Sequence, residues 1–153
     1  MIIRYSKLRE DVITPTRANP SDAGLDVYYC PEEFRTKRCR LQPGDSRVLS
    51  IGLKFEIPHG YMLEVKNRSG MAAKRSLVVG ACVIDSGYEG EVFINLHNVG
   101  STTQYVDAGT KIAQLVLTPV VHFRPQETAS DALYSEYPMT ISDRGDGALG
   151  STG

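Results

Sequence analysis

The chain has 153 residues, of which 41% are hydrophobic and 23% are charged, and its formal net charge is -1. This length fits one domain with a substantial core, and the near-neutral charge excludes a broad attraction to nucleic acid or to an anionic membrane. No apolar stretch approaches transmembrane length, and the three cysteines lack the spacing of a disulfide framework or a zinc site. We therefore expect a reduced, cytoplasmic protein.

A polar turn at residues 22–26, DAGLD, is the first distinctive feature along the chain. It places Asp22 and Asp26 on either side of a flexible Ala-Gly pair. A carboxylate in such a turn can cap the turn, or it can face a metal ion through the water that the ion binds. The residues alone favour neither interpretation.

Residues 47–60, RVLSIGLKFEIPHG, alternate apolar and polar side chains, which predicts a strand with one buried face. The residues expected on this face are Leu49, Ile51, Leu53, Phe55 and Ile57. The pattern recurs in 91–98, where the expected buried residues are Val92, Ile94 and Leu96. Further strand-like runs occupy 61–65, 76–84 and 111–121, and turn signals lie at 42–45, 57–60, 85–90 and 106–110. Many short strands with regular turns predict an all-β sandwich or barrel.

One stretch, SGMAAKRS at residues 69–76, predicts a short helix. Helix-forming residues follow Ser69, which we expect to be the N-cap. The free N–H groups at the start of a helix can bind an anion, and Arg68 stands directly before this one. An Arg–Ser pair at this place is more commonly a simple surface cap, so both interpretations stay open.

The apolar run at 76–84 leads to Asp85, which opens the turn DSGYEG and precedes Tyr88. We expect Asp85 at the end of a buried strand. Aspartate is common at the first position of a turn, and a tyrosine nearby can be an ordinary packing residue. Each of these signals is weak by itself, and only their combination in one small β-rich chain suggests a site.

From about residue 130 the strand pattern is lost. We expect an extended connector there, with a folded domain at 1–136 and a flexible C-terminal arm at 137–153. The arm ends in RGDGALGSTG at 144–153, which contains too much glycine to fold alone. An arginine, hydroxyl groups and unhindered glycine N–H groups can together bind phosphate, and the alternative is a disordered terminus.

Taken in order, five segments resemble the signature motifs of the trimeric dUTPases, the deoxyuridine triphosphate nucleotidohydrolases. The segments are DAGLDVY (22–28), NRSGMAAK (67–74), VVGACVIDSGYEGEV (78–92), GTKIAQLVL (109–117) and RGDGALGSTG (144–153). The resemblance is specific because all five occur in the family's order and approximate spacing. It implies a β-jelly-roll with one short helix and a flexible C-terminal arm, assembled into a homotrimer with shared active sites.

Members of this family hydrolyse dUTP to dUMP and pyrophosphate with Mg²⁺, which limits uracil incorporation into DNA and supplies dUMP for dTMP synthesis. The resemblance implies that Asp85 holds and polarises the attacking water. It implies that Ser69 lies near the oxygen between the α- and β-phosphorus atoms, and that Gln114 bonds near the phosphates and their waters. Asp26 is expected to contact Mg²⁺ through water.

The resemblance also implies how the substrate is bound. Tyr88 is expected to pack under the deoxyribose and to leave no room for a 2′-hydroxyl group. A hairpin is expected to read uracil with its backbone, and its residues are Val79, Ala81, Cys82, Val83, Ile84 and Asp85. The phosphate chain is assigned to Arg68, Ser69, Gly70 and Gln114. The arm is expected to close over the nucleotide with Arg144, Leu149, Gly150, Ser151 and Thr152.

Three positions depart from the family pattern. Leu149 stands where a phenylalanine usually stacks on uracil, Ala148 replaces a frequent glycine, and Cys82 replaces a common small residue. Leucine can cover a base but has no π-face, so we expect weaker closure of the arm. Two other functions stay open: dCTP deamination on the same superfold, and a non-catalytic nucleotide-sensing role. The combination of Asp85 and Tyr88 in VIDSGY favours hydrolysis of dUTP.

Overall fold

Antiparallel β-structure dominates the computed structural model of the chain, which describes residues 1–32 and 37–134. The strands are β1 (Arg4–Lys7), β2 (Leu25–Tyr28), β3 (Arg38–Leu41), β4 (Ser46–Ser50), β5 (Leu53–Glu56), β6 (Tyr61–Lys66), β7 (Leu77–Val79), β8 (Val83–Asp85), β9 (Phe93–Asn98), β10 (Gln104–Asp107) and β11 (Lys111–Pro119). Within these described ranges the one helix is α1 (Ser69–Arg75), between β6 and β7. The prediction of an all-β fold with one short helix is confirmed.

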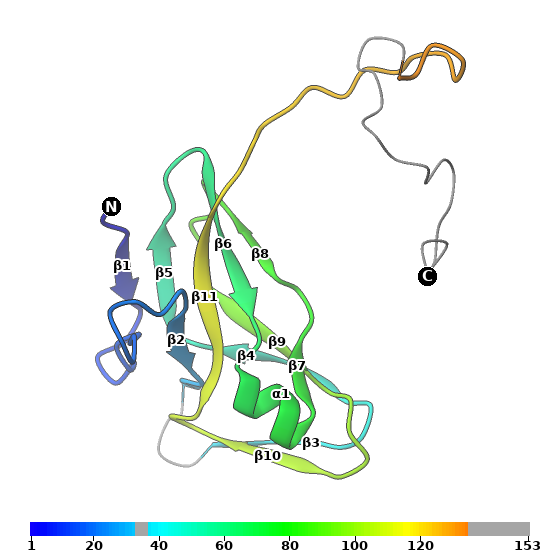
Figure 1. The fold of residues 1–153 in the computed structure, drawn as a ribbon. Helices are drawn as coiled ribbons and strands as arrows, with labels where there is room; N and C mark the ends of the chain where they lie inside the picture. The colour runs from blue at the N-terminus through cyan, green and yellow to red at the C-terminus, as the bar shows by residue number, and fades with distance from the viewer. Residues whose placement is uncertain (33–36, 135–153) are drawn as a thin grey trace. The chain divides into compact units, whose positions relative to one another are not determined.

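The strands form two larger sheets and two two-stranded ribbons. One sheet has the order β2-β11-β6-β8 and the other has the order β4-β9-β7, while β1 pairs with β5 and β10 with β3. Figure 1 shows β11 running between β2 and β6, with the edge strand β8 beyond β6. Strands far apart in the sequence are therefore neighbours in both larger sheets, as the predicted β-jelly-roll requires.

One hydrophobic core joins the two larger sheets. Val65 on β6 and Leu115 on β11 enter it from one sheet, and Ile94 and Leu96 on β9 enter it from the other. Burial of a side chain of this size contributes about 1.5–3 kcal/mol to folding. Every apolar residue that the alternating pattern places inside is buried, namely Leu49, Ile51, Leu53, Phe55, Ile57, Val92, Ile94 and Leu96.

The stretch predicted as one strand at 47–60 in fact contains two strands in different sheets. β4 ends at Ser50 and β5 begins at Leu53, with Gly52 between them at a φ of +69°. A Cβ atom on Gly52 would lie 2.3 Å from Cγ2 of Val12, so a side chain there is excluded by both space and backbone conformation. The alternation continues across the break because both strands face the same core.

The hairpin expected around residues 79–84 is also different from the prediction. β7 pairs with β9, whereas β8 pairs with β6, so the two strands belong to different sheets and form no ladder with each other. Asp85 does not end a buried run either, because it is exposed and Val83 on the same strand is 55% exposed. β8 lies at the edge of its sheet, where only one side is covered.

The helix α1 buries Met71 and is linked to β10 by Arg75, which bonds the Gln104 side chain and the Tyr105 carbonyl. The predicted N-cap is wrong by one residue. Arg68 occupies the N-cap position with extended backbone, and no side chain makes a capping hydrogen bond. Ser69 is instead the first residue of the helix.

Four strands were not predicted, because each is only four residues long and lies outside the apolar runs of the sequence. They are β1, which is exposed along its whole length, β2, which begins inside the segment predicted as a turn at 22–26, and the paired strands β3 and β10. β1 gains its place by pairing with β5, whereas β3 and β10 pair with each other and also bury Leu41 and Val106 in the core. Side-chain patterning is therefore a weak signal for ribbons at the surface.

The chain divides into two compact units, Met1–Val121 and His122–Gly153. In the described part of the second unit, the N–H groups of Ala132 and Leu133 donate to the Ala129 carbonyl, so the predicted extended connector contains a turn. The three cysteines are free, and burial raises the pKa of the Cys30 thiol. Within the described ranges, no helix is both long and apolar enough to cross a membrane.

Candidate functional site

Three neighbouring strands bring the first group of predicted site residues together. Gln114 on β11 lies opposite Asp26 on β2 and opposite Lys66, the last residue of β6. The chain then continues from β6 into the segment that starts α1. These elements enclose a cavity of about 400 Å³, lined by Ala18, Asp22, Gly24, Asp26, Arg68, Ser69, Gly70 and Gln114. We call this cavity the helix-side pocket.

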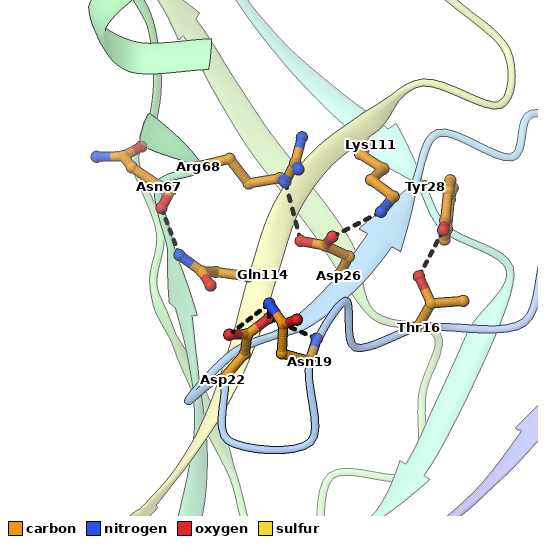
Figure 2. Close-up of polar contacts among 9 residues, drawn as sticks. All are labelled: Thr16, Asn19, Asp22, Asp26, Tyr28, Asn67, Arg68, Lys111 and Gln114. Atoms are coloured by element: carbon orange, nitrogen blue, oxygen red, sulfur yellow. Dashed lines mark hydrogen bonds and ion pairs between the residues drawn. The ribbon is translucent and has the colours of Figure 1, made fainter. Parts of the chain in front are cut away.

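Asp26 is the buried carboxylate of this pocket, with 13% of its side chain exposed, and two cations hold it (Figure 2). Arg68 Nε lies 2.9 Å from Oδ1, and Lys111 Nζ lies 2.9 Å from Oδ2. The hydrogen bond with Asp26 raises the pKa of the Lys111 ammonium. The same ammonium lies 5.7 Å from the centre of the Tyr28 ring. Asp26 therefore orients Arg68, whose guanidinium lines the pocket.

Gln114 fixes the segment that leads into α1. Its Nε2 donates to the Asn67 carbonyl at 2.8 Å, and Oδ1 of Asn67 accepts from the Val79 N–H at 2.7 Å (Figure 2 shows the first of these contacts). A Cβ atom on Gly24 would lie 1.9 Å from Oε1 of Gln114, so only glycine leaves room for this side chain. Gln114, through its Nε2, thus helps to place Arg68 and Ser69 by holding the residue before them.

The start of α1 supplies hydrogen-bond donors to the same pocket. The first N–H groups of any helix have no partner within the helix, and here no side chain caps them. Arg68, Ser69 and Gly70 all line the pocket, and a Cβ atom on Gly70 would meet nothing within 4 Å. A guanidinium, a hydroxyl group and open backbone donors are a suitable set for a chain of phosphates.

A second cavity, of about 250 Å³, contains the other predicted residues. It is lined by Val83, Ile84, Asp85, Tyr88, Glu91 and Phe93, and we call it the turn-side pocket. Among the described residues, the Asp85 carboxylate has no hydrogen-bond or ion-pair partner, and it is exposed. The Tyr88 hydroxyl donates to the Glu91 carbonyl at 2.8 Å, which fixes the ring across the turn.

The loop between β7 and β8 leaves one residue open. The N–H groups of Val79 and Gly80 donate to Asn67 and Asn95, and the Cys82 carbonyl accepts from Val65. Ala81 is exposed, and its N–H and carbonyl groups make no hydrogen bond with any described residue. An adjacent backbone donor and acceptor of this kind can pair with the edge of a base.

The helix-side and turn-side pockets share no lining residue and lie far apart in one chain. Asp85 is opposite Met62 near the start of β6, whereas Gln114 is opposite Lys66 at its end. At about 3.3 Å per residue, these positions are separated by roughly 13 Å along the strand.

Several predicted residues have no described position. Arg144, Leu149, Gly150, Ser151 and Thr152 lie outside the described residues. In the described part of the chain, no three His, Cys, Asp or Glu side chains form a group that could hold a metal ion alone. Sequence reasoning missed Asn67, Lys111 and Glu91, although all three stand inside the quoted motifs.

Comparison with known proteins agrees with these observations. The family model described as dUTPase matches residues 10–153. The deoxyuridine 5′-triphosphate nucleotidohydrolase of Clostridium acetobutylicum is 34% identical over 153 residues, which cover 99% of this chain and 96% of that protein. The corresponding protein of Anaplasma marginale is 34% identical over 145 residues, covering 91% of this chain and 88% of that protein.

Solved structures show the same fold at lower identity. The dUTPase of Staphylococcus bacteriophage 80alpha with bound dUpNHpp has a TM-score of 0.81 and 23% identity, and the match covers 99% of this chain and 98% of that one. A mutant dUTPase from phage phi11 of S. aureus, described with a structural Mg(II) ion, has a TM-score of 0.74 and 24% identity, covering 84% of this chain and 97% of that one.

Proposed function

The chain belongs to the dUTPase family, a family of hydrolases, and we propose that it cleaves dUTP to dUMP and pyrophosphate at a site shared between copies. The observation that carries this proposal is the unpaired Asp85 carboxylate beside the fixed Tyr88 ring in the turn-side pocket. In this proposal Asp85 accepts a proton from a water molecule aligned with the α-phosphorus. Positioned base catalysis of this kind typically contributes about 10²–10⁴ in rate.

The turn-side pocket binds the nucleoside in this proposal. The open N–H and carbonyl groups of Ala81 match the acceptor and donor at the edge of uracil, and the backbone from Val79 to Ile84 surrounds the base. Tyr88 lies under the deoxyribose in this proposal. The hydrogen bond from its hydroxyl group to the Glu91 carbonyl fixes the ring in that position. A 2′-hydroxyl group would collide with the ring, so UTP is rejected by shape.

The helix-side pocket binds the phosphate chain. Arg68, held by Asp26, pairs with phosphate oxygens, and the N–H groups of Ser69 and Gly70 donate to them. Ser69 lies near the oxygen that leaves the α-phosphorus. Gln114 positions the segment before α1 and bonds to phosphates or their waters. These donors stabilise the negative charge that moves toward pyrophosphate as the bond breaks.

Magnesium suits the helix-side pocket. Mg²⁺ binds oxygen ligands, keeps several of its waters and is commonly held by one or two carboxylates plus substrate phosphates. The pocket offers Asp22 and Asp26, and a carboxylate oxygen that already accepts from a cation still has a free lone pair. Asp26 would contact the ion through water. When bound, the ion neutralises charge on the phosphates.

A homotrimer brings the two pockets together. The turn-side pocket of one copy would face the helix-side pocket of the next, so each site takes residues from two copies. The C-terminal arm, with Arg144, Leu149 and Ser151, would close over the bound nucleotide and exclude water. In the cell the reaction would limit uracil incorporation into DNA and supply dUMP for dTMP synthesis.

A nucleotide panel tests the proposal. Purified protein is incubated with dUTP, UTP, dTTP or dCTP, with Mg²⁺ or with EDTA, and nucleoside monophosphate, pyrophosphate and ammonia are measured. We expect dUMP and pyrophosphate from dUTP only, and only with Mg²⁺. Ammonia from dCTP would indicate a deaminase, and binding without any product would indicate a nucleotide sensor.

Substitution of the proposed base separates catalysis from binding. Asp85→Asn should reduce turnover by about 10²-fold or more while dUTP binding persists, because the amide cannot accept the proton of water. Glu89→Gln is the matched control, since Glu89 is an exposed carboxylate on the same turn. A rate for Asp85→Asn close to that of the wild type would contradict the assigned base.

A further inference from the structure

We propose that Glu91 is a positioning residue whose carboxylate fixes the Tyr88 ring and thereby sets the rejection of ribonucleotides. The proposal rests on the function given above, because it assigns Tyr88 to the sugar. Glu91 follows the turn after β8 and lines the turn-side pocket without belonging to any predicted group of site residues. Its role can be inferred only from the hydrogen bonds that join it to Ser50 and Gly52, about forty residues earlier in the chain.

The Glu91 carboxylate is anchored to the junction between β4 and β5. Oε1 accepts from the Gly52 N–H at 2.9 Å and from the Ser50 hydroxyl group. Glu91 is only partly exposed and makes no ion pair with any described residue, so these two donors stabilise its charge. Hydrogen bonds to a charged group typically contribute more than those between neutral groups.

The junction that holds Glu91 is itself tied to other parts of the fold by backbone hydrogen bonds. Gly52 has a φ of +69°, and its carbonyl accepts from the Leu8 N–H at 2.9 Å. Next along the chain, the Val92 N–H donates to the Leu53 carbonyl at 2.9 Å. Gly52 and Leu53 are therefore held by backbone hydrogen bonds to Leu8 and Val92. We call these two residues the frame, and no nucleotide is needed to hold it.

The other end of Glu91 holds the tyrosine. The Glu91 carbonyl accepts from the Tyr88 hydroxyl at 2.8 Å. The ring lies so close to the turn that a Cβ atom on Gly90 would be 2.4 Å from the Tyr88 hydroxyl oxygen. Tyr88 has 47% of its surface exposed, so few neighbours fix it apart from this turn. The ring position therefore depends on where the frame places residue 91.

Loss of the carboxylate should affect the two substrates unequally. Without the anchor, the segment around Glu91 can shift, and the Tyr88 ring can move away from the sugar. To exclude a 2′-hydroxyl group, the Tyr88 ring must keep its position when the group contacts it. Binding of deoxyribose does not require a ring fixed in this way. Glu91→Ala should therefore reduce discrimination between dUTP and UTP more than it reduces hydrolysis of dUTP itself.

The test compares kcat/KM for dUTP with kcat/KM for UTP in four proteins: wild type, Glu91→Ala, Glu91→Gln and Glu89→Ala. We expect the ratio to fall about tenfold in Glu91→Ala, and to stay within about threefold of the wild type in Glu91→Gln, which keeps the acceptor oxygen. Glu89→Ala removes the same charge from the same turn and should leave the ratio unchanged. Equal losses for both substrates in Glu91→Ala would overturn the proposal.

Two further variants keep the proposal testable if Glu91→Ala does not fold. Ser50→Ala removes one donor to the carboxylate and should lower the same ratio by about threefold, whereas an unchanged ratio would overturn the proposal. In a Tyr88→Phe background the link to the Glu91 carbonyl is absent, so Ser50→Ala should add no further loss of discrimination. An added loss equal to that in the wild-type background would contradict the mechanism.

The outcomes distinguish a failure of the proposed function from a failure of the role assigned to Glu91. Wild-type protein that hydrolyses no nucleotide would overturn the proposed function, and with it the role of Glu91. Wild-type protein that prefers dUTP, together with a Glu91→Ala variant of equal preference, would overturn the role of Glu91 alone.

Discussion

At the scale of single residues, Ser69 illustrates how a local motif can be assigned the wrong structural role. A serine before helix-forming residues predicts an N-cap, but Ser69 is the first helical residue and makes no capping hydrogen bond. The sequence also could not predict that Asp26 pairs with Lys111, or that Asn67 bonds to Val79, because these contacts depend on strand pairing across the fold. The residue types at Arg68, Ser69 and Gly70 left a surface cap equally open; the resemblance assigned them to phosphate, and the structure places all three on one pocket.

Ser69→Ala tests whether this serine serves function instead of folding. Loss of a helix cap typically costs about 1 kcal/mol, but a side chain that caps nothing should cost less than about 0.5 kcal/mol. We therefore expect an unchanged midpoint in urea unfolding and a reduced kcat/KM for dUTP. Asn98→Ala is the contrasting variant: Asn98 is buried and makes hydrogen bonds to Leu41, Thr102 and Gly100, so unfolding should become easier by about 2 kcal/mol or more. A Ser69→Ala protein as unstable as Asn98→Ala would show that the serine is structural.

At the scale of elements, the alternating pattern predicted burial more accurately than connectivity. Leu49, Ile51 and Leu53 are buried as expected, yet the chain leaves one sheet and enters another between them. Apolar periodicity reports which side chains face the core, and the core of a two-sheet fold is common to both sheets. The glycine at 52 is the local signal for the break, because its φ of +69° is a conformation that side chains disfavour.

Gly52→Ala should therefore destabilise the fold strongly. The substitution adds backbone strain of about 1–2 kcal/mol and a clash with Val12, whose Cγ2 would lie 2.3 Å from the new atom. Gly44→Ala is the matched control, since Gly44 has a φ of +81° but no atom within 4 Å of an added Cβ. Urea unfolding should show a larger loss for Gly52→Ala than for Gly44→Ala. Equal losses would mean that the close approach to Val12 relaxes without cost.

At the scale of the whole molecule, the sequence predicts a folded unit and a C-terminal arm with different tasks. All buried apolar residues in the described ranges lie before residue 122, inside the unit Met1–Val121. The sequence placed the start of the arm at residue 137, and that boundary stays a prediction. The arm could be recognised from its composition and from its resemblance to a motif, but glycine-rich segments carry no pattern that predicts a conformation.

Removal of residues 137–153 should leave a folded protein with little activity. Every buried apolar residue in the described ranges lies before residue 122, so we expect circular dichroism and thermal unfolding to match those of the full chain. The value of kcat/KM for dUTP should fall by about 10²-fold, because closure over the nucleotide positions its phosphates and excludes water. Arg144→Ala should reproduce part of the loss, whereas Arg124→Ala, in the described part of the same unit, should not. Full activity after truncation would remove the arm from the mechanism.

The separation of the two pockets is the property of the whole molecule on which the account depends most. Asp85 is paired with Met62 of β6, and Gln114 is paired with Lys66, four residues further along the same strand. No sequence pattern could predict this separation, because it follows from which strands pair and in which register. If both pockets act on one nucleotide, as we propose, the unit of function is a pair of adjacent copies, and this can be tested without a structure of the assembly.

Complementation between two inactive variants is the most direct test. Asp85→Asn lacks the turn-side base and Arg68→Ala lacks a helix-side cation, so each protein alone should be nearly inactive. Unfolding and refolding a 1:1 mixture should restore about one quarter of the wild-type rate, since random assembly gives that share of sites both intact halves. A mixture that stays as inactive as its two components would show that each chain acts on dUTP alone, and would contradict the shared site.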